Sequence, residues 1–224
     1  MFWVIFMVTV YLIRHCEAEG NVRGIFQGST DLDITPLGAK QLEFLSKRFE
    51  NIHIDRVYSS PLLRAYKTAQ AVAAPKGLEV ITDEDLREIN GGVIEGMKLS
   101  DVFVHYPELE DKWGNEFQNF APELGDNVRD VYERIWNSVT RIVRENDGKT
   151  VAIASHGGAL RTLICRITEG DIEKINNVCW LDNTAVTKIV FNDDMSFSTC
   201  FVNDSSHVPP EYMPAAHKIS SQGK

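Results

Sequence analysis

The chain has 224 residues, 43% of them hydrophobic and 25% charged, which suits one globular domain with a core that folds without a disulfide or a metal. A formal net charge of -9 makes nucleic acid and anionic lipid unfavourable partners, because these polyanions repel an acidic protein. The cysteines form no CxxC pair, which argues against a metal site and predicts reduced thiols in a cytoplasmic protein; they are Cys16, Cys165, Cys179 and Cys200.

The N-terminus, residues 1–7, is apolar but too short to span a bilayer, which takes about 20 residues. It lacks the basic start and the small-residue cleavage site of a signal peptide. Because a buried strand is predicted from Val8, Met7 would be a natural alternative start, and we expect residues 1–6 to be dispensable for the fold.

Strand-like and helix-like segments then alternate, which predicts α/β layering around a mostly parallel sheet. An apolar strand over 8–13 is followed by a polar loop to Ile34. Thr35-Pro36 has the signature of a helix start, with Thr as N-cap and Pro in the first turn; the buried face of this helix is Leu37, Leu42, Leu45 and Phe49. A short strand over 56–58 precedes Ser60-Pro61, which repeats that signature and predicts a helix to about residue 73.

A strand is expected over 78–82, followed by a segment that is harder to interpret. Residues 97–125 are acidic and interrupted by Pro107, Pro122 and Gly125, so we expect an irregular insertion over the site, with Ser100 capping at most a short helix. The domain boundaries predicted from this pattern are one domain over 1–203 and a polar C-terminal tail over 204–224.

The strongest helical pattern starts at Asp126 as N-cap and ends at Asp147-Gly148. Its apolar residues fall at helical spacing; they are Val128, Val131, Tyr132, Ile135, Val139, Ile142 and Val143. A strand over 150–154, a turn at Gly157-Gly158 and a helix to about Ile167 form a βα unit. Residues 184–191 and 197–202 predict a closing hairpin.

Two histidines stand directly after predicted buried strands: His15 in Arg14-His15, and His156 in Ser155-His156-Gly157-Gly158. In an open α/β sheet, ligands bind at the carboxyl ends of the strands, so we expect one shared site with residues suited to phosphate. Taken alone, a histidine such as His15 after a strand more often has a structural, hydrogen-bonded role. A hydrolase with Ser155 or Ser60 as nucleophile is disfavoured, because no Gly-x-Ser-x-Gly elbow exists.

Arg64 and Glu88 are further candidates. Arg64 falls in the first turn of a predicted helix, where free N–H groups and a guanidinium suit phosphate, although a solvated arginine fits the same pattern. Glu88 lies in a glycine-rich loop, and a carboxyl close to bound phosphate keeps its proton more readily. Glu88 could equally be a surface glutamate without a catalytic role. Three nearby carboxyl groups are other candidates for the acid: Glu84, Asp85 and Glu95.

Taken together, these blocks resemble the histidine phosphatase superfamily, which includes the cofactor-dependent phosphoglycerate mutases. The family's opening motif, Leu-x-Arg-His-Gly-Glu-Thr-x-x-Asn, is matched by Leu12 to Asn21, with Cys16 in place of Gly and Ala18 in place of Thr. The further blocks follow in the family's order over residues 8 to about 191: Phe26 to Asp31, Thr35 to Gly38 with Gln41, Ser59 to Ala65 with Thr68-Ala69, Leu86 to Glu88, Gly125 to Arg134, Ser155 to Gly158, and Asn183-Thr184.

The resemblance implies a three-layer α/β/α sandwich and a phosphomonoesterase that needs no metal or other cofactor. His15 would be the nucleophile and form a phosphohistidine, with its second ring nitrogen held by a backbone carbonyl. Glu88 would protonate the leaving oxygen. The phosphoryl group would be bound by Arg14, Arg64 and His156, assisted by Asn21, Gln27, Gly28 and Gly157. Cys16 would be either an activated thiol or a buried, inert one.

Two other functions stay open: a phosphoglycerate mutase and a non-catalytic module that binds a phosphorylated ligand. The mutases carry a long basic insertion, whereas residues 97–125 are short and acidic, with only Lys98 and Lys112 to bind a second anionic group. A phosphatase acting on a small phosphomonoester is therefore favoured. The insertion contains four aromatic residues, which would either line a pocket for the substrate or form the core of the insertion itself: Tyr106, Trp113, Phe117 and Phe120. The sequence leaves a monomer and a homodimer open.

Overall fold

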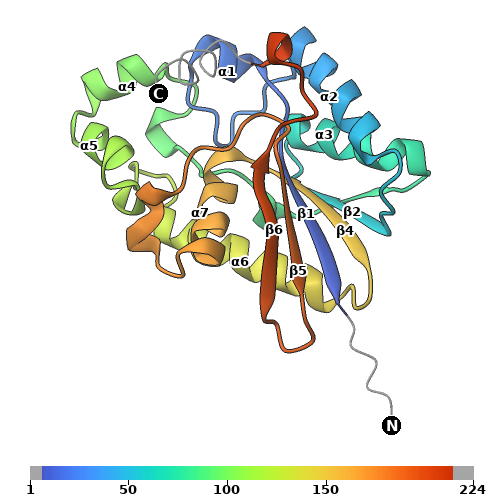
Figure 1. Cartoon of the computed structure of the whole chain (residues 1–224). Coiled ribbons are helices and arrows are strands. Elements are labelled where there is room, and N and C mark those ends of the chain that lie inside the picture. The colour runs from blue at the N-terminus through green and yellow to red at the C-terminus, as the bar shows by residue number, and fades with distance from the viewer. Residues whose placement is uncertain (1–6, 214–224) are drawn as a thin grey trace.

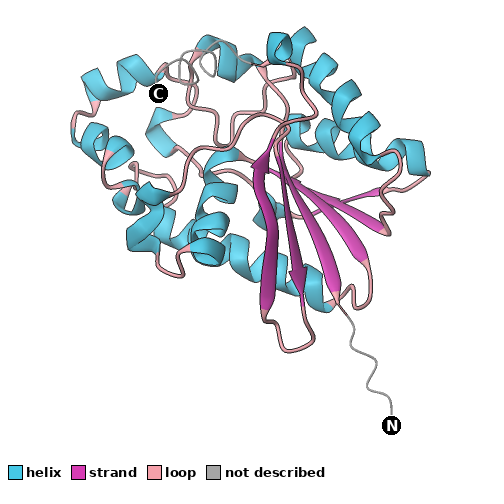
Figure 2. Ribbon diagram, in the orientation of Figure 1, coloured by secondary structure: helices cyan, strands magenta, loops and turns pink. Residues whose placement is uncertain are grey.

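The computed structural model describes residues 7–213, and its centre is a single six-stranded sheet in the order β3-β2-β4-β1-β5-β6 (Figures 1 and 2). Four neighbouring strands are parallel: β1 (Val8–Arg14), β2 (Arg56–Ser59), β3 (Val80–Thr82) and β4 (Thr150–Ser155). The hairpin of β5 (Val186–Phe191) and β6 (Phe197–Asp204) joins them antiparallel through β5. The predicted mostly parallel sheet and closing hairpin are confirmed.

Helices cover both faces of this sheet, which confirms the three-layer sandwich. On one face α2 (Pro36–Phe49) and α3 (Leu63–Ala73) pack with Tyr11 and Ile13 of β1. On the other face α6 (Val128–Arg144) and α7 (Gly157–Thr168) pack with Val10 and Leu12 of the same strand. Because side chains alternate along a strand, one apolar run supplies both core layers.

The helix starts show where tertiary contacts override local signals. Thr35 caps α2 as predicted, since its Oγ1 accepts the Gly38 N–H at 2.9 Å. The predicted start of α3 is wrong by two residues: α3 begins at Leu63, because the Ser60 hydroxyl is bonded to His156 at 2.8 Å. Similarly α6 is capped by Asn127, because Asp126 instead accepts the Asn90 N–H at 3.0 Å.

Other boundaries shift by a few residues. The helix α6 ends at Arg144, before the predicted Asp147-Gly148 stop, although every predicted apolar residue on it is buried. Strand β3 begins at Val80 rather than 78, since the Leu78 N–H still bonds the end of α3 at Ala73. The short helix α1 (Glu19–Arg23) interrupts the first loop. The 3-10 turns are Ala74–Lys76, Glu84–Leu86, Gly92–Ile94, Phe117–Asn119, Ile172–Asn177 and Pro210–Tyr212.

The segment expected to be irregular is largely helical. It contains α4 (Leu99–His105), α5 (Glu108–Gly114) and the turn Phe117–Asn119, and we call residues 99–119 the helical insert. Ser100 does not cap α4, which begins one residue earlier. The insert folds because it has its own apolar residues to bury, namely Val102, Leu109 and Phe117, which join the core on the α6 and α7 side.

The C-terminal segment packs on α2 beyond the predicted domain end at 203. Val208 and Met213 are buried, and the Gln41 side chain donates to the Tyr212 carbonyl at 3.0 Å. Residues 1–6 and 214–224, which include the rest of the predicted tail, lie outside the described residues. Within residues 7–213, no helix has the length and apolarity needed to cross a bilayer.

Candidate active site

The two histidines meet because β1 and β4 are adjacent parallel strands that end together. Arg14 is paired with Ser155, and the His15 N–H donates to the Ser155 carbonyl at 2.9 Å. Both side chains are buried, and the centroids of the His15 and His156 rings lie 5.3 Å apart. The carboxyl ends of these two strands therefore form one site, as expected from the sequence.

The His15 ring is held in one tautomer. Its Nδ1 lies 2.6 Å from the Cys16 carbonyl oxygen, which only accepts, so Nδ1 carries the hydrogen and Nε2 keeps its lone pair. Burial, with smaller contributions from the charges of Arg64 and Arg14, lowers the pKa of His15 well below its usual value. The imidazole is therefore neutral near pH 7, the form that acts as a nucleophile.

The departures from the family motif are accommodated in this loop. Cys16 is buried, and burial raises the pKa of its thiol to about 12, so it is an inert thiol rather than an activated one. Its backbone does not lie in the left-handed region, so a Cβ fits. Ala18 is the N-cap of α1 and has no side-chain oxygen to cap it, but its own N–H donates to Asn21 Oδ1 at 2.9 Å.

Three buried nitrogen atoms near His15 have no hydrogen-bond partner within the described residues: Arg14 Nε, Arg64 Nε and His156 Nδ1. The rest of each group is anchored. Arg14 donates to the Leu181 carbonyl, Arg64 donates to the carbonyls of residues 27, 28 and 30, and His156 Nε2 lies 2.8 Å from Ser60 Oγ. Unpaired buried polar groups are costly, and an oxyanion would satisfy all three.

Charge supports the same interpretation. Burial lowers the pKa of Arg14 and of Arg64, but a guanidinium keeps its proton at neutral pH even so. Burial, followed by the charge of Arg64, also lowers the pKa of His156 well below its usual value. Two fixed positive charges therefore lie next to two neutral imidazoles, which suits a dianionic phosphoryl group.

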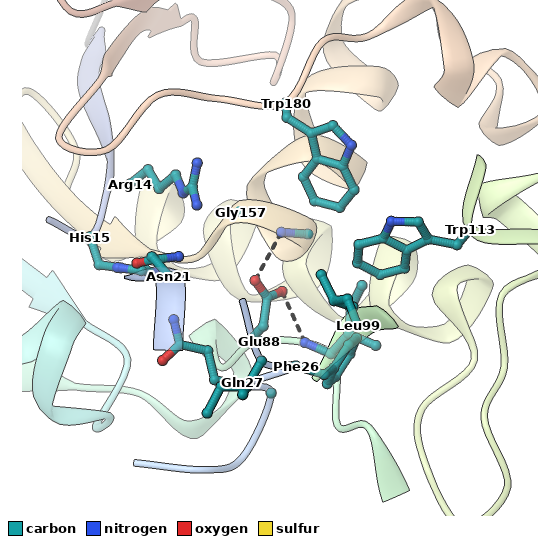
Figure 3. A pocket seen from close by; sticks show the side chains of 14 residues that line it. Arg14, His15, Asn21, Phe26, Gln27, Glu88, Leu99, Trp113, Gly157 and Trp180 are labelled. Carbon is teal, nitrogen blue, oxygen red and sulfur yellow. Dashed lines mark hydrogen bonds between the residues drawn. The ribbon is translucent and has the colours of Figure 1, made fainter. Parts of the chain in front are cut away.

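A cavity of about 190 Å³ opens beside His15 (Figure 3). Seven of the nine predicted site residues line it: Arg14, His15, Asn21, Gln27, Gly28, Glu88 and Gly157. Arg64 and His156 do not form part of its wall and are instead buried next to His15. The amide oxygen of Gln27 is buried without a partner in the described part of the chain.

Glu88 faces the amino end of α7 across this cavity (Figure 3). Its Oε2 accepts the Gly158 N–H at 2.9 Å, and its Oε1 accepts the N–H groups of Ala159 at 2.8 Å and Ile89 at 3.0 Å. A Cβ added to Gly158 would lie 2.6 Å from Ile89 Cδ1 and 2.7 Å from Glu88 Oε1, so any larger residue there would displace these side chains.

Glu88 is the single carboxyl group among the described residues that line the cavity. Of its competitors, Glu84 is largely exposed and pairs with Arg87, and Asp85 is exposed. Glu95 has a different position: it accepts the N–H groups of Ser29, Thr30 and Gly91, at 2.7, 3.0 and 2.7 Å, and the Thr30 hydroxyl. Glu95 therefore fixes the loop whose carbonyls bind Arg64.

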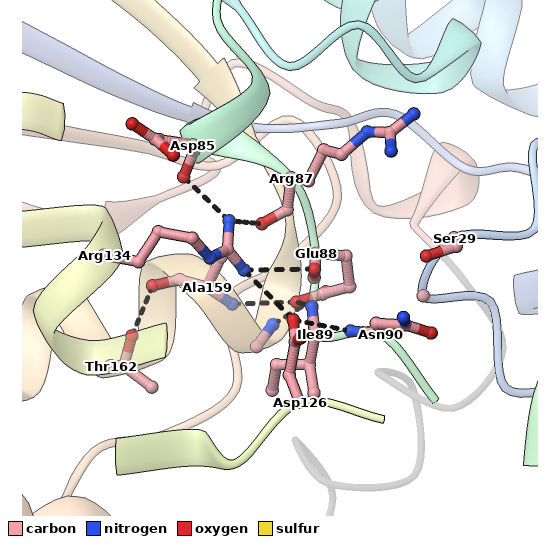
Figure 4. A network of polar contacts seen from close by, with 12 residues as sticks. Ser29, Asp85, Arg87, Glu88, Ile89, Asn90, Asp126, Arg134, Ala159 and Thr162 are labelled. Atoms are coloured by element: carbon pink, nitrogen blue, oxygen red, sulfur yellow. Dashed lines mark hydrogen bonds and ion pairs between the residues drawn. The ribbon is translucent and has the colours of Figure 1, made fainter. Parts of the chain in front are cut away.

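Arg134 holds the backbone around Glu88, a contact that the sequence did not predict (Figure 4). Its guanidinium donates to the carbonyls of Asp85, Arg87 and Glu88 at 2.8, 3.0 and 3.2 Å. It also pairs with Asp126, at 3.5 Å. Arg134 lies in a motif that matches the family, but helical spacing alone gives no sign that it reaches a loop 46 residues earlier.

These features fit an α/β protein with a site suited to an oxyanion, and comparison with known proteins identifies its family. Residues 10–204 match the histidine phosphatase superfamily, branch 1, and the chain belongs to this family. Phosphoserine phosphatase 1 of Hydrogenobacter thermophilus is 34% identical over 168 residues, which cover 75% of this chain and 80% of that protein. A 2,3-bisphosphoglycerate-dependent phosphoglycerate mutase of Bartonella tribocorum is 32% identical over 163 residues, or 70% and 79% of the two chains.

Solved structures agree with the fold. The structure of Bacillus stearothermophilus YhfR has a TM-score of 0.84 at 31% identity and covers 90% of this chain and 100% of that one. A phosphoserine phosphatase from Entamoeba histolytica in complex with 3-phosphoglyceric acid has a TM-score of 0.79 at 27% identity, with 90% and 100% of the two chains covered.

Proposed function

We propose that this protein is a metal-independent phosphomonoesterase that acts through a phosphohistidine at His15. The observation that carries the proposal is the group of unpaired buried nitrogens, Arg14 Nε, Arg64 Nε and His156 Nδ1, around a neutral imidazole of fixed tautomer. Relatives named as phosphatases support the same reaction class.

In the first step, His15 Nε2 attacks phosphorus in line, a P–N bond forms and the bond from phosphorus to the ester oxygen breaks. Glu88 gives its proton to that oxygen, and the alcohol leaves. In the second step, Glu88 takes a proton from water, the water oxygen attacks phosphorus, and the P–N bond breaks to give phosphate and free His15.

The cationic groups serve this reaction by positioning and charge. Arg14, Arg64 and His156 bind the phosphoryl oxygens, and Asn21, Gln27, Gly28 and the Gly157 N–H complete the binding site. Phosphoryl transfer depends mainly on such positioning and electrostatic stabilisation, so these residues replace a metal ion. Arg134 and Glu95 are positioning residues, because the first fixes the backbone of Glu88 and the second fixes the loop that holds Arg64.

Hydrolysis is favoured over mutase activity by the rest of the cavity. A mutase has to bind a second anionic group of its substrate, and neither Lys98 nor Lys112 lines the cavity. Arg14 is the single Lys or Arg side chain among its described lining residues, and the phosphoryl group uses it. We further propose a cytoplasmic protein with one domain, whose C-terminal boundary moves from 203 to Met213 because residues 205–213 pack on α2.

The test is phosphate release from p-nitrophenyl phosphate in the presence of EDTA. We expect turnover by the unmodified protein and a loss of more than about 1,000-fold for His15→Ala, since the nucleophile is removed. His53→Ala is the matched control, because the His53 side chain is exposed and pairs with Asp55 far from the cavity, so the activity of this variant should be unchanged. Activity of His15→Ala within about tenfold of the parent would contradict a covalent role. Bisphosphate-dependent interconversion of 2- and 3-phosphoglycerate would favour a mutase instead.

A further inference from the structure

The cavity has two chemically different halves. Polar groups, from Arg14 and His15 to Glu88 and Gly157, line the half at the strand ends. The other half is formed by apolar side chains, with no charged one among the described residues: Ile25, Phe26, Ile89, Leu99, Trp113 and Trp180. Figure 3 shows Trp113 and Trp180 side by side on the side of the cavity away from His15. A phosphoryl group at His15 would direct the rest of its ester toward this apolar half.

Trp113 and Trp180 form an aromatic wall of the cavity. Trp113 comes from the helical insert and Trp180 from the segment after the turn Ile172–Asn177, and their rings stack with centroids 5.3 Å apart at 26°. Trp113 also packs edge-on against Phe26, at 5.8 Å. Trp180 keeps 39% of its surface exposed, so its ring remains accessible to a ligand.

Arg161 holds Trp180 in place without reaching the cavity. Its guanidinium lies over the Trp180 ring at 4.6 Å and over the Phe117 ring at 4.8 Å. The same guanidinium donates to the carbonyls of Ile175 at 3.2 Å, within the turn that precedes Trp180, and of Val178 at 2.9 Å, directly after that turn. Cation–π contact and these hydrogen bonds together fix the ring, so binding against it costs little ordering entropy.

The apolar half has neither the charged partners nor the hydrogen-bonding groups that a charged or polyhydroxylated alcohol would need. A carboxylate, an ammonium group or a second phosphate there would lose its hydration without gaining a charged partner. Apart from the indole N–H groups, these six side chains have no hydrogen-bonding atoms for sugar hydroxyls. A volume of about 190 Å³ for the whole cavity is below the roughly 300–1,000 Å³ of sites for drug-sized ligands, so the ester is small.

We propose that the preferred substrate is the phosphate monoester of a small, uncharged alcohol that carries one aromatic ring, and that Trp113 and Trp180 determine this specificity. The inference rests on the proposed phosphatase function for its chemistry, but the binding preference is a property of the cavity itself. It differs from what the names of the phosphoserine phosphatases among the relatives would suggest, because phosphoserine carries both an ammonium and a carboxylate group.

The kinetic test compares esters of primary alcohols, so that the leaving groups are similar. Benzyl phosphate should be hydrolysed with a kcat/KM at least about tenfold above those of n-propyl phosphate and O-phospho-L-serine. Trp113→Ala and Trp180→Ala should each lower kcat/KM for benzyl phosphate by about tenfold, mainly through KM, and change the value for n-propyl phosphate by less than about twofold. Trp180→Phe should restore most of the preference, since it keeps an aromatic face.

Trp136→Ala is the matched control. Trp136 packs on Phe191 and Phe197 of the β5–β6 hairpin and does not line the cavity, so any effect should be equal for all three esters. Thermal unfolding of each variant verifies that it is folded. Equal kcat/KM values for benzyl phosphate and O-phospho-L-serine, or a Trp180→Ala variant that keeps the preference, would overturn the inference while leaving the phosphatase function intact.

A binding measurement separates the two proposals. Benzylphosphonate cannot be hydrolysed, and calorimetry should show that it binds at least about tenfold more tightly than methylphosphonate, with the difference lost in Trp180→Ala. This result would support the aromatic site even if no ester were turned over, in which case the phosphatase function alone would fail. Equal affinities for the two phosphonates would reject the aromatic site whatever the enzyme activity.

Discussion

Burial controls the chemistry of the two site histidines. His15 and His156 lie 5.3 Å apart beside Arg64, and desolvation together with this positive charge keeps both imidazoles neutral. The neutral form is needed at His15 for attack on phosphorus. At His156 the unpaired Nδ1 offers the phosphoryl group a hydrogen-bonding nitrogen. The same environment affects the free energy of unfolding, because the two histidines bind protons more weakly in the folded protein than in the unfolded chain.

Stability should therefore fall with pH below about 6.5. An unfolded histidine has a pKa near 6.5, whereas the pKa of folded His15 and His156 is well below it, so in this range the unfolded state binds more protons. Each imidazole then removes up to about 1.4 kcal/mol of unfolding free energy per pH unit, and neither contributes above this range. Urea unfolding at pH 7.5 and 5.5 measures the effect.

His156→Asn supplies the comparison for that measurement. This variant should lose less stability than the parent between pH 7.5 and pH 5.5, because one of the two histidines whose pKa the fold lowers has been removed. His53→Asn, at an exposed position, should follow the parent. Parallel pH dependences for the parent and His156→Asn would show that His156 is not held neutral by the fold.

Glu88 is expected to act as the acid, and leaving groups test this. An alkyl ester needs its departing oxygen protonated, whereas nitrophenolate leaves without help. Glu88→Gln should therefore slow an alkyl phosphate at least about tenfold more than p-nitrophenyl phosphate. Rates for both esters with the parent and the variant provide the ratio. An equal loss on both would remove Glu88 from the acid role.

Two loops complete the site formed at the ends of β1 and β4: the loop around Glu88 and the loop that contains Ser29 and Thr30. One charged residue fixes each loop. Arg134 on α6 binds the carbonyls around Glu88 (Figure 4). Glu95 accepts the N–H groups of Ser29 and Thr30. The carbonyls of that second loop in turn hold Arg64. Since catalysis depends on positions held to within fractions of an ångström, these contacts should matter for rate although neither residue touches the phosphoryl group.

Glu95→Gln distinguishes positioning from acid catalysis. The amide NH2 of glutamine would face backbone N–H groups that now donate to the Glu95 carboxylate, and some of these hydrogen bonds would be lost. The loop, and with it the Arg64 side chain, should therefore be held less firmly. We expect kcat/KM to fall by about 10- to 100-fold, by the same factor for nitrophenyl and alkyl esters. Glu84→Gln is the control, because Glu84 is exposed and outside the cavity. A loss confined to alkyl esters would mean that Glu95 is itself the acid.

At the level of elements, the sequence predicts what depends on local pattern. The apolar run of β1, the Thr35 cap of α2 and the amphipathic face of α6 are local, and the structure confirms them. The start of α3 depends on a bond between Ser60 and His156, which are 96 residues apart, and no local pattern contains it. In the insert the sequence indicates only one short helix, near Ser100, and gives no sign of α5, because short segments with prolines nearby have weak periodicity and gain their stability from the core.

The site divides in the same way. Ordered motifs predict His15 and Gly157 at the ends of strands and the start of a helix, and Glu88 in a glycine-rich loop; all three residues line the cavity. The aromatic wall was only partly foreseen: Trp113 was a candidate for a pocket, but Trp180 was not, because it lies in a segment without a motif. Its partner Trp113 is 67 residues earlier in the chain, so only the fold brings the two rings together.

The whole molecule combines a strongly acidic surface with a small basic centre. The net charge of -9 contrasts with the buried guanidinium groups of Arg14 and Arg64 at the ends of the parallel strands. Long-range attraction therefore contributes little to substrate capture, and recognition depends on contacts inside the cavity. The sheet order places β1 between β4 and β5, so His15, directly after β1, lies at the carboxyl end of a central strand of the sheet, and helices cover both faces of that sheet (Figure 1).

Trapping the phosphorylated enzyme tests the central claim most directly. The protein is mixed with excess p-nitrophenyl phosphate, quenched in denaturant at alkaline pH, where phosphohistidine survives, and analysed by mass spectrometry of its peptides. We predict one added phosphoryl group on the peptide that contains His15, and none in His15→Ala. A parent enzyme that turns over while the phosphoryl group is found on another residue would contradict the account.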